Sequence, residues 1–534
     1  MPDWDVVVVG AGSNGLVLAG ELAARGLRVL ALEARLEAGG LLTTEECSIH
    51  GYWHNMLGGL FNAFAATPPY RLLDLGRENA RYRVPAVQAA LPLRDGRAVV
   101  FTTDPDTTCA SLAALSARDA RTYRGLRTGP LSAWAAQLVQ AAYTPPDGNA
   151  PDGARPLGVP LPAALARYAA LSPREVVADL FESPHVQAAV LQQLVVPWGV
   201  LPDYAGLGAA ALLALSGAAP LAVALGGAHV TAQALIRALV RRGGRYQVLK
   251  TVRRVLVEDG AAVGVELADG TAIRARAVVS SGGVQQTLLD LVGEEALDAE
   301  LAARVRAFQL DEYALFGVHL ALARAPDYPL TDRRDAARAP APGQGPHNLP
   351  LPGDALRLFV GAETPDELDA LWQEVRAGIL PAPRGMTVIV PSLYDERQAP
   401  RGHHTAVLLQ PAPYAPDGDA ARWDSLRAAY AARCVAAWRV YAPNLTDGDI
   451  LACIPLTPRD VATRYGNLAA GALGMGRMTA DQTGAQRPLP ELARYRTPLR
   501  GLYLCGTCTY PGPGWLGAAG HNAAQVVLQD LASA

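Results

Sequence analysis

The sequence predicts an α/β protein whose first domain begins with a strand–turn–helix–strand unit. Residues 5–9 form a β-branched run without polar alternation, as expected for a parallel strand buried on both faces. A glycine-rich turn follows, and residues 16–25 have the apolar spacing of a helix that ends at Gly26. Residues 27–32 form a second apolar strand that ends at Glu33. This order is typical of a Rossmann-type nucleotide-binding domain.

The turn carries the pattern Gly10-x-Gly12-x-x-Gly15, in which each glycine has a physical reason. The first permits a tight turn, the second lets a diphosphate approach the backbone, and the third lets the helix pack on the strand. The helix N-terminus faces the phosphates, and Glu33 can accept hydrogen bonds from both ribose hydroxyls. An acid there disfavours a 2′-phosphate, so NADP is a poor fit. The pattern predicts a dinucleotide site; the alternative is a glycine turn in some other α/β protein.

Composition excludes several classes of function. The chain has 534 residues, 18% of them charged, and a formal net charge of −3. No lysine- or arginine-rich block is present, so nucleic acid is not an expected partner. Lys250 is the only lysine, which excludes a phosphate-loop lysine or a Schiff base at any other position. The length exceeds a single core and predicts two associated domains.

No basic segment precedes the first strand, so a secretory signal is not expected and the cytoplasm is the expected compartment. Residues 205–225 are uncharged and long enough to span a bilayer, but alanine and glycine dominate them and Pro220 interrupts them. We expect a buried helix there, or an apolar surface near a substrate entrance, which also allows peripheral contact with a membrane. Cys505 and Cys508 have the spacing of a redox dithiol; the simpler reading is two small residues that close a strand.

The middle of the chain continues the nucleotide domain. Gly226 and Gly227 precede a helical run that reaches Arg242. Three strand-like segments follow, at residues 246–257, 263–267 and 277–280. Asp-Gly turns separate them, at residues 259–260 and 269–270. We expect two hairpins that form a small antiparallel sheet crossing over the parallel one. Residues 144–161 and 331–353 are rich in proline, glycine and charge and are expected to be long surface loops.

The residues after Glu33 favour FAD over NAD. Glu33-Ala34-Arg35 runs into Gly39-Gly40, so a cation and a second glycine pair follow the ribose-binding acid. Together with segments at residues 478–482, 487–488, 495–498, 501–506 and 511–522, this pattern resembles the FAD-dependent amine oxidase and phytoene desaturase superfamily, in particular bacterial phytoene desaturase-like proteins. The resemblance covers most of the chain. It departs at residues 510–515, where relatives commonly have His-Pro-Gly-Gly-Gly-Val and this chain has Tyr-Pro-Gly-Pro-Gly-Trp.

The resemblance implies a discontinuous FAD-binding domain, residues 1–85, 221–310 and 455–534, with an interleaved α+β substrate domain, residues 86–220 and 311–454. It implies that the C-terminal strand–loop–helix cradles the isoalloxazine, with a helix N-terminus facing the pyrimidine end, where the reduced ring is anionic. The expected cofactor-binding residues are Gly10, Gly12, Ser13, Asn14, Gly15, Glu33, Ala34, Arg35, Gly39, Gly40, Leu41, Val252, Gly506, Gly514, Trp515, Leu516, Gly517 and Ala518.

Four residues are candidates for catalysis or substrate contact. His54 and His319 can accept a proton. A structural role, in which the ring nitrogens are hydrogen-bonded within the fold, explains each of them at least as well. Trp515 can shape the site or stack against substrate, or simply pack, and Tyr510 lies in the same divergent stretch. No metal is expected, because His403-His404 fits a solvated loop pair without a spaced partner.

The leading hypothesis is hydride transfer between a substrate carbon and flavin N5 on a large apolar polyene, either isoprenoid or polyketide. A second is a redox cyclase or tailoring enzyme of the kind that acts on polyene tetramate macrolactams. Amine oxidation is a third; it is disfavoured because flavin amine oxidases typically keep a lysine near flavin N5, and Lys250 lies beside the expected adenine strand. A non-catalytic flavin-binding protein is the fourth. The sequence indicates no oligomeric state.

Overall fold

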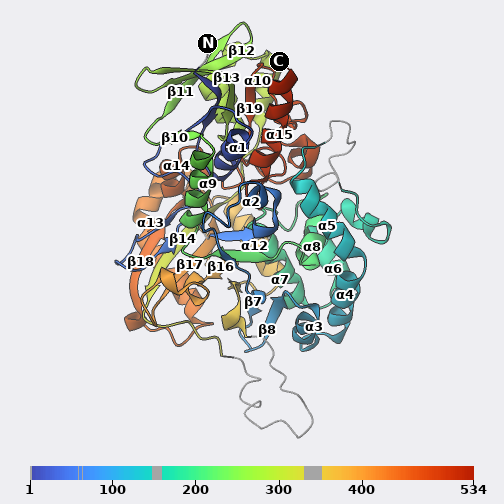
Figure 1. Ribbon diagram of the computed structural model, residues 1–534. Coiled ribbons are helices and arrows are strands. Elements are labelled where there is room, and N and C mark those ends of the chain that lie inside the picture. The colour runs from blue at the N-terminus through green and yellow to red at the C-terminus, as the bar shows by residue number, and fades with distance from the viewer. Residues whose placement is uncertain (1–2, 58, 63, 147–158, 330–350, 534) are drawn as a thin grey trace.

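The computed structural model of the chain describes residues 3–57, 59–62, 64–146, 159–329 and 351–533. It contains two seven-stranded sheets, one in the upper half and one in the lower half of Figure 1. Both ends of the chain lie beside the upper sheet. The expected α/β class is confirmed. Most of the two predicted surface loops lies outside the described residues.

The upper sheet is parallel in one part and antiparallel in the other. Its order is β10-β2-β1-β13-β12-β11, with β19 beside β13. The strands are β1 (Trp4–Val9), β2 (Val29–Leu32), β10 (Arg245–Gln247), β11 (Val252–Glu258), β12 (Ala261–Leu267), β13 (Ala272–Ser280) and β19 (Leu502–Leu504). The first residues of β13 pair antiparallel with β12, and from Ala275 onward β13 pairs parallel with β1. The two predicted hairpins are confirmed; Asp259 and Gly260 both have the positive φ that a type I′ turn requires.

Strand β1 is buried on both faces, as its unbroken valine run predicts. Val6 and Val8 pack in one apolar cluster, and Val7 packs in another on the opposite face. The first cluster includes helices α1 (Ser13–Ala23), α9 (His229–Arg241) and α15 (Ala518–Ser533). Each fully buried valine stabilises the fold by roughly 1.5–3 kcal/mol. The sheet is therefore the centre of the core at this end of the molecule.

One predicted strand is two strands in the structure. The segment expected at residues 246–257 divides between β10, which pairs parallel with β2, and β11, which joins the antiparallel part. The break lies at Leu249, which has φ +56°. There the backbone amide of Leu249 donates to Arg35 O and that of Lys250 to Glu33 O, so the chain follows the end of β2 out of the sheet. The β-branched composition of the segment hides this turn.

The lower sheet has the order β18-β14-β17-β16-β15-β7-β8. Its strands are β7 (Val87–Pro92), β8 (Ala98–Thr102), β14 (Ala314–Leu322), β15 (Arg357–Val360), β16 (Met386–Ile389), β17 (His404–Ala412) and β18 (Ile450–Leu456). Every residue of β14 is buried. Phe316 and Val318 pack on α13 (Trp423–Arg439), whereas Leu315 and His319 alternate with them and point to the other face.

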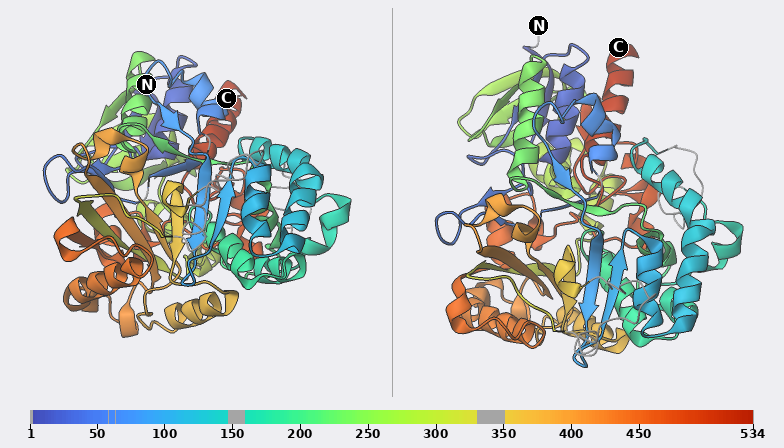
Figure 2. Two further views of the ribbon diagram at one scale, coloured as in Figure 1. Left: turned by 90° about the horizontal axis from the view of Figure 1, so that it is seen from below. Right: turned by 60° about the horizontal axis from the view of Figure 1, so that its bottom comes forward.

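A bundle of helices covers one side of β7 and β8, as both views of Figure 2 show. Its members are α3 (Pro105–Ala113), α4 (Ala117–Thr128), α5 (Pro130–Ala142), α6 (Pro173–Leu180), α7 (Pro184–Val195) and α8 (Gly208–Ser216). Helix α8 lies within the apolar stretch 205–225 and is largely buried, as expected. It ends at Gly217 in the left-handed conformation, and the chain continues into the short strand β9 (Leu221–Ala224). In the described part of the chain, no helix has the length and apolarity that a bilayer crossing requires.

Smaller elements connect the two sheets and flank them. The helices are α2 (Pro68–Leu72), α10 (Ala299–Ala307), α12 (Pro365–Arg376) and α14 (Pro458–Tyr465). The short strands are β3 (Thr44–Glu45), β4 (His54–Asn55), β5 (Leu60–Asn62) and β6 (Tyr82–Arg83). All strands of the upper sheet come from the predicted nucleotide segments. Those of the lower sheet come from the predicted substrate segments, except that β18 crosses the boundary at residue 455. The domain division itself stays a prediction.

Candidate functional site

Two adjoining cavities lie between the sheets. The first, which we call the nucleotide cavity, opens at the carboxyl ends of β1, β2 and β13 and measures about 1450 Å³ with the space at its mouth. The second, which we call the apolar cavity, measures about 1150 Å³ on the same basis. Five residues line both: Ser13, Asn14, Leu41, Leu473 and Thr507. The cavities therefore adjoin each other beside the N-terminus of α1.

The wall of the nucleotide cavity has the features that a diphosphate and a ribose require. A methyl group on Gly12 would approach nothing nearer than Gly40 Cα, at 3.9 Å, so the backbone at Gly12 is open to the cavity. Glu33 is held by two backbone amides: Ala11 N donates to Oε2 at 3.1 Å and Arg35 N donates to Oε1 at 3.0 Å. Each carboxylate oxygen retains acceptor capacity for a ribose hydroxyl.

The structure brings most of the predicted cofactor residues to these walls. The nucleotide cavity is lined by Gly10, Gly12, Ser13, Asn14, Glu33, Ala34, Arg35, Gly40, Leu41 and Val252. The apolar cavity is lined by Ser13, Asn14, Leu41, Gly514, Trp515, Leu516 and Gly517. Four predicted residues line neither: Gly15, Gly39, Gly506 and Ala518. Gly15 has a packing role, because a Cβ there would lie 2.1 Å from Gly10 O.

Two further segments of the nucleotide cavity wall were not predicted. Residues 280–282 lie directly after β13, and residues 463–468 span the end of α14. In the second segment the ring of Tyr465 lies under the Arg35 guanidinium, with 4.6 Å between the guanidinium carbon and the ring centroid. The first segment carries a usable signal, since ligands bind at the carboxyl ends of parallel strands and Ser281-Gly282-Gly283 follows one. The second carries none in the sequence.

The apolar cavity has one charged side chain among its described lining residues, Asp311. Aliphatic and aromatic side chains make up most of the wall, including Leu57, Leu60, Phe61, Val195, Val196, Tyr313, Leu315, Leu473 and Trp515. A carboxyl group in such surroundings has lost most of its hydration, which disfavours its charged form. Asp311 was not among the predicted residues, because no motif surrounds it.

The carboxyl group of Asp311 is only partly satisfied. Gly474 N donates to Oδ2 at 2.8 Å, whereas Oδ1 is buried and has no hydrogen-bond partner in the described residues. Burial raises the pKa of Asp311 to about 7, against the opposing effects of the Gly474 hydrogen bond and the nearby Arg487 charge. A carboxyl group with this pKa exchanges a proton readily near neutral pH.

Arg487 holds together the loops that carry Asp311's partner. Its guanidinium is fully buried and donates to the backbone oxygens of Gly474, Gly476, Arg477, Gln482 and Thr507. Gly474 and Thr507 both line the apolar cavity. One side chain thus fixes two walls of that cavity and places a positive charge near Asp311.

Three of the four candidate catalytic residues lie away from the walls of both cavities. Tyr510 is buried, and its hydroxyl donates to Ala141 O at 2.9 Å. His54 and His319 are buried against each other, with ring centroids 5.6 Å apart in an edge-on arrangement. Burial lowers the pKa of His54 to about 4 and that of His319 to about 3. Only Trp515 lines a cavity, and the catalytic assignments stay predictions.

The remaining polar candidates do not form a redox or solvent-exposed site. Cys505 and Cys508 are free, buried thiols whose pKa values are raised by burial, and they fit the simpler reading of small residues closing a strand. His403 hydrogen-bonds to the hydroxyl of Tyr52, and His404 Nδ1 lies 3.1 Å from Ser392 Oγ at the start of β17. The histidine pair is therefore tied to its neighbours rather than freely solvated.

Comparison with known proteins places the chain among oxidoreductases. Residues 8–74 match the family described as "NAD(P)-binding Rossmann-like domain". The chain is 29% identical to a limonene dehydrogenase component of Castellaniella defragrans, over 99% of this chain and 95% of that protein. It is 27% identical to the lycopene-forming phytoene desaturase of a Paracoccus species, over 99% of this chain and 98% of that protein. The structure of cyclohexylamine oxidase from Brevibacterium oxydans superposes with a TM-score of 0.59 at 17% identity, over 99% of this chain and all of that one, which shows a shared fold.

We expect Arg487→Met to destabilise the fold and distort the apolar cavity. The substitution keeps apolar volume but leaves five buried carbonyl oxygens without their donor, which costs about 3–5 kcal/mol of unfolding free energy. Denaturant unfolding measures the loss. Arg494→Met is the matched control: Arg494 is exposed, and its replacement is expected to change the free energy by less than about 0.5 kcal/mol. Equal effects of the two substitutions would contradict the role assigned to Arg487.

Proposed function

We propose that this chain, which is an oxidoreductase of the phytoene desaturase-like class, binds FAD and dehydrogenates a carbon–carbon bond of a large apolar polyene or isoprenoid. One observation carries the proposal. The apolar cavity shares five lining residues with the nucleotide cavity, and Asp311 is the one charged side chain among its described lining residues.

The residues of the nucleotide cavity fit FAD. The open backbone at Gly12 and the N-terminus of α1 suit the diphosphate, and Glu33 suits the ribose. Val252 also lines this cavity, and the resemblance to the family assigns a residue at this place to the adenine. When bound, FAD supplies a hydride acceptor at N5 of its isoalloxazine ring. Ser13, Asn14 and Leu41, which line both cavities, support an arrangement in which the ring reaches the apolar cavity.

The apolar cavity suits a hydrocarbon better than a polar metabolite. Its aliphatic and aromatic wall offers few hydrogen-bond partners, so desolvation of an apolar substrate supplies most of the binding free energy. Relatives named limonene dehydrogenase and phytoene desaturase support a terpenoid or carotenoid-like substrate for this chain. A polyene polyketide has the same physical character, and Trp515 on the wall is placed to pack against either.

Asp311 is the residue that we assign to proton transfer. Dehydrogenation removes a hydride from one carbon and a proton from its neighbour, and the proton needs an acceptor in a site that excludes water. The unpartnered Oδ1 of Asp311 is such an acceptor. The amide of Gly474 orients the carboxyl group, and the buried guanidinium of Arg487 favours its ionised form. His54, His319 and Tyr510 are not required for this step.

Three alternatives give different outcomes in experiment. Redox cyclisation of a macrolactam-type polyene uses the same cofactor and cavity and differs in its product. Amine oxidation is supported by the shared fold of cyclohexylamine oxidase. It is opposed by the position of Lys250, which lines the nucleotide cavity and pairs with Asp269 at 3.3 Å. A protein that binds flavin without catalysis would show no reduction by any substrate.

Anaerobic mixing of the oxidised protein with candidate substrates tests the reaction class. We expect limonene, phytoene or a polyene macrolactam to reduce the bound flavin, seen as loss of its visible absorbance, because a desolvated hydrocarbon fills the cavity. Simple primary amines, in parallel samples, are expected to leave the absorbance unchanged. Reduction by amines alone would overturn the proposal in favour of amine oxidation, and reduction by no compound would favour a binding protein.

Gly12→Ala is expected to weaken cofactor binding without unfolding the protein. The methyl group has room in the fold but occupies the place where the diphosphate meets the backbone, and we expect the FAD affinity to fall roughly a hundredfold, about 2.7 kcal/mol. Fluorescence titration of the apoprotein measures it. Gly125→Ala is the control, because nothing lies within 4 Å of the added methyl group on helix α4. FAD binding as tight as in the wild type would refute the assignment of Gly12.

Asp311→Asn is expected to lower kcat by about 10²–10⁴-fold, because the amide cannot accept the proton. In the wild type, kcat/KM is expected to fall as the pH drops below about 7, where Asp311 becomes protonated. Glu312→Gln is the neighbouring control, since Glu312 pairs outward with Arg376 and Arg477. A pH profile of Asp311→Asn that matches the wild type in shape and height would contradict the assignment.

The same substitution changes the pH dependence of stability. The pKa of Asp311 is raised in the folded protein, so the unfolded chain releases this proton at lower pH and stability is lost as the pH rises towards 7. Asparagine carries no such proton. We therefore expect Asp311→Asn to raise the melting temperature relative to the wild type at pH 8, and to do so less at pH 5.

A further inference from the structure

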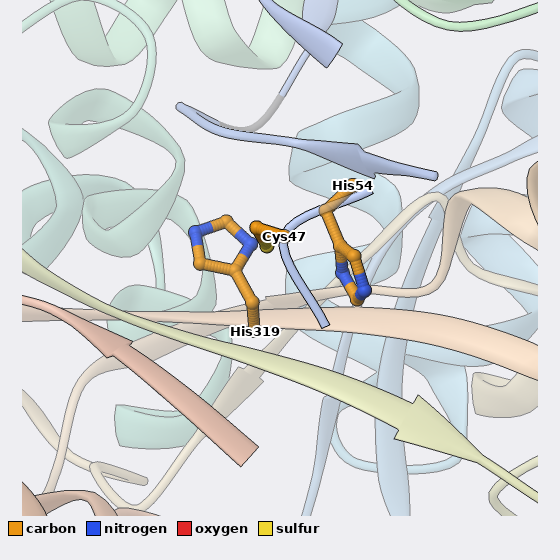
Figure 3. A group of neighbouring side chains, drawn as sticks. All are labelled: Cys47, His54 and His319. Carbon is orange, nitrogen blue, oxygen red and sulfur yellow. The ribbon is translucent and has the colours of Figure 1, made fainter. Parts of the chain in front are cut away.

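A cysteine and two histidines meet at a point that the proposed reaction does not use. The potential ligand atoms of Cys47, His54 and His319 all lie within 4.8 Å of one another, and Figure 3 shows the three side chains gathered above strand β14. Cys47 follows β3, His54 begins β4, and the two strands pair as a short antiparallel ladder. His319 comes from the middle of β14 in the lower sheet. The cluster thus joins two distant parts of the chain.

His319 is the residue whose surroundings are hardest to explain without a ligand. The side chain is fully buried, and neither ring nitrogen makes a hydrogen bond of good geometry to the described residues, although the backbone of Met56 lies near the ring. Each nitrogen of an imidazole carries either an N–H donor or an acceptor lone pair, and burying both unpaired is unfavourable. A metal ion bound to one nitrogen removes much of this penalty.

The ring of His54 is held by a hydrogen bond of the kind that commonly orients metal-binding histidines. Its Nε2 lies 2.7 Å from Ser48 Oγ, which leaves Nδ1 as the nitrogen available to an ion. Metal-binding histidines commonly use their second nitrogen in such a hydrogen bond, which fixes the ring orientation. The ring stands edge-on to His319 at 89°, so the two rings present their edges rather than stacking.

We propose that Cys47, His54 and His319 form a Zn²⁺ site that ties the β3–β4 ladder to β14. A thiolate and two neutral imidazoles are typical zinc ligands, at about 2.0–2.3 Å from the ion. The proposal requires side-chain rotations that bring the three atoms, now within 4.8 Å of one another, to these distances from one ion. Cys47 is half-buried, so a water molecule can complete the tetrahedron. Zinc binding releases the thiol proton of Cys47 to solvent and forms one Zn–S bond and two Zn–N bonds, with no change of oxidation state.

The site acts on the shape of the apolar cavity. Residues 57, 59 and 60 follow β4 directly and line that cavity, so an ion that fixes His54 also fixes the segment leading into the wall. None of the three ligands lines either cavity, and the role assigned to the ion is structural. The expectation that the protein holds no metal is replaced by this proposal. It does not depend on the bound flavin or on the reaction.

Metal analysis of the tag-free full-length protein tests the site. After dialysis against a weak chelator and titration with ZnCl₂, we expect close to one tightly bound Zn²⁺ per wild-type chain and a higher melting temperature. Cys47→Ser is expected to weaken Zn²⁺ binding at least about a hundredfold. Cys453→Ser is the matched control, because Cys453 is free and exposed on β18. Zinc bound equally by the wild type and Cys47→Ser, or by neither, would overturn the proposal.

Cobalt substitution covers the case in which Cys47→Ser fails to fold. Co²⁺ added to the metal-free wild type is expected to give thiolate-to-metal charge-transfer absorption in the near ultraviolet, together with visible bands of tetrahedral coordination. Wild-type protein whose Co²⁺ complex shows no thiolate band would refute the site. FAD content, measured on the same samples, is expected to be independent of the variant at Cys47, so failure of the metal proposal and failure of the cofactor proposal are separable.

Discussion

Two glycines let the backbones of neighbouring elements meet at distances that leave no room for a side chain, and these contacts hold the two adjoining cavities in place. A Cβ on Gly15 would lie 2.1 Å from Gly10 O, and one on Gly520 would lie 2.0 Å from Asn14 O. These contacts bring the N-termini of α1 and α15 to one point, beside the carboxyl ends of β1 and β13. Because larger residues would push these elements apart, the glycines fix the position of Ser13 and Asn14, which line both cavities.

The local parts of this arrangement are predictable from sequence. The valine run, the glycine turn and Glu33 predict the first βα unit, and the Asp-Gly turns predict the hairpins of β11, β12 and β13, since each signal acts within a few residues. Leu249 shows the limit. Its positive φ follows from hydrogen bonds to the end of β2, a partner distant in sequence, and nothing in its own composition signals a turn.

The chemistry of the site depends on contacts that no local pattern records. Asp311 is functional in our proposal because it is the charged residue of an apolar wall, and its proton affinity depends on burial, Gly474 and Arg487 together. The two histidines singled out in the sequence are near each other in space, and Cys47, which the sequence analysis does not single out, lies beside them. In both cases residues distant in the sequence are brought together by the fold, and no local sequence pattern marks them.

The segments of the upper sheet come from both ends and the middle of the chain. Strand β19 and helix α15, near the C-terminus, complete the sheet and cover α1 near the N-terminus. During synthesis, therefore, the first βα unit is made long before β19 and α15, and the mid-chain strands β10 and β13 and helix α9 can pack on it before those two elements are made. The last contacts of the sheet therefore close the longest loops in the described chain, and loop closure of this length favours slow completion of folding.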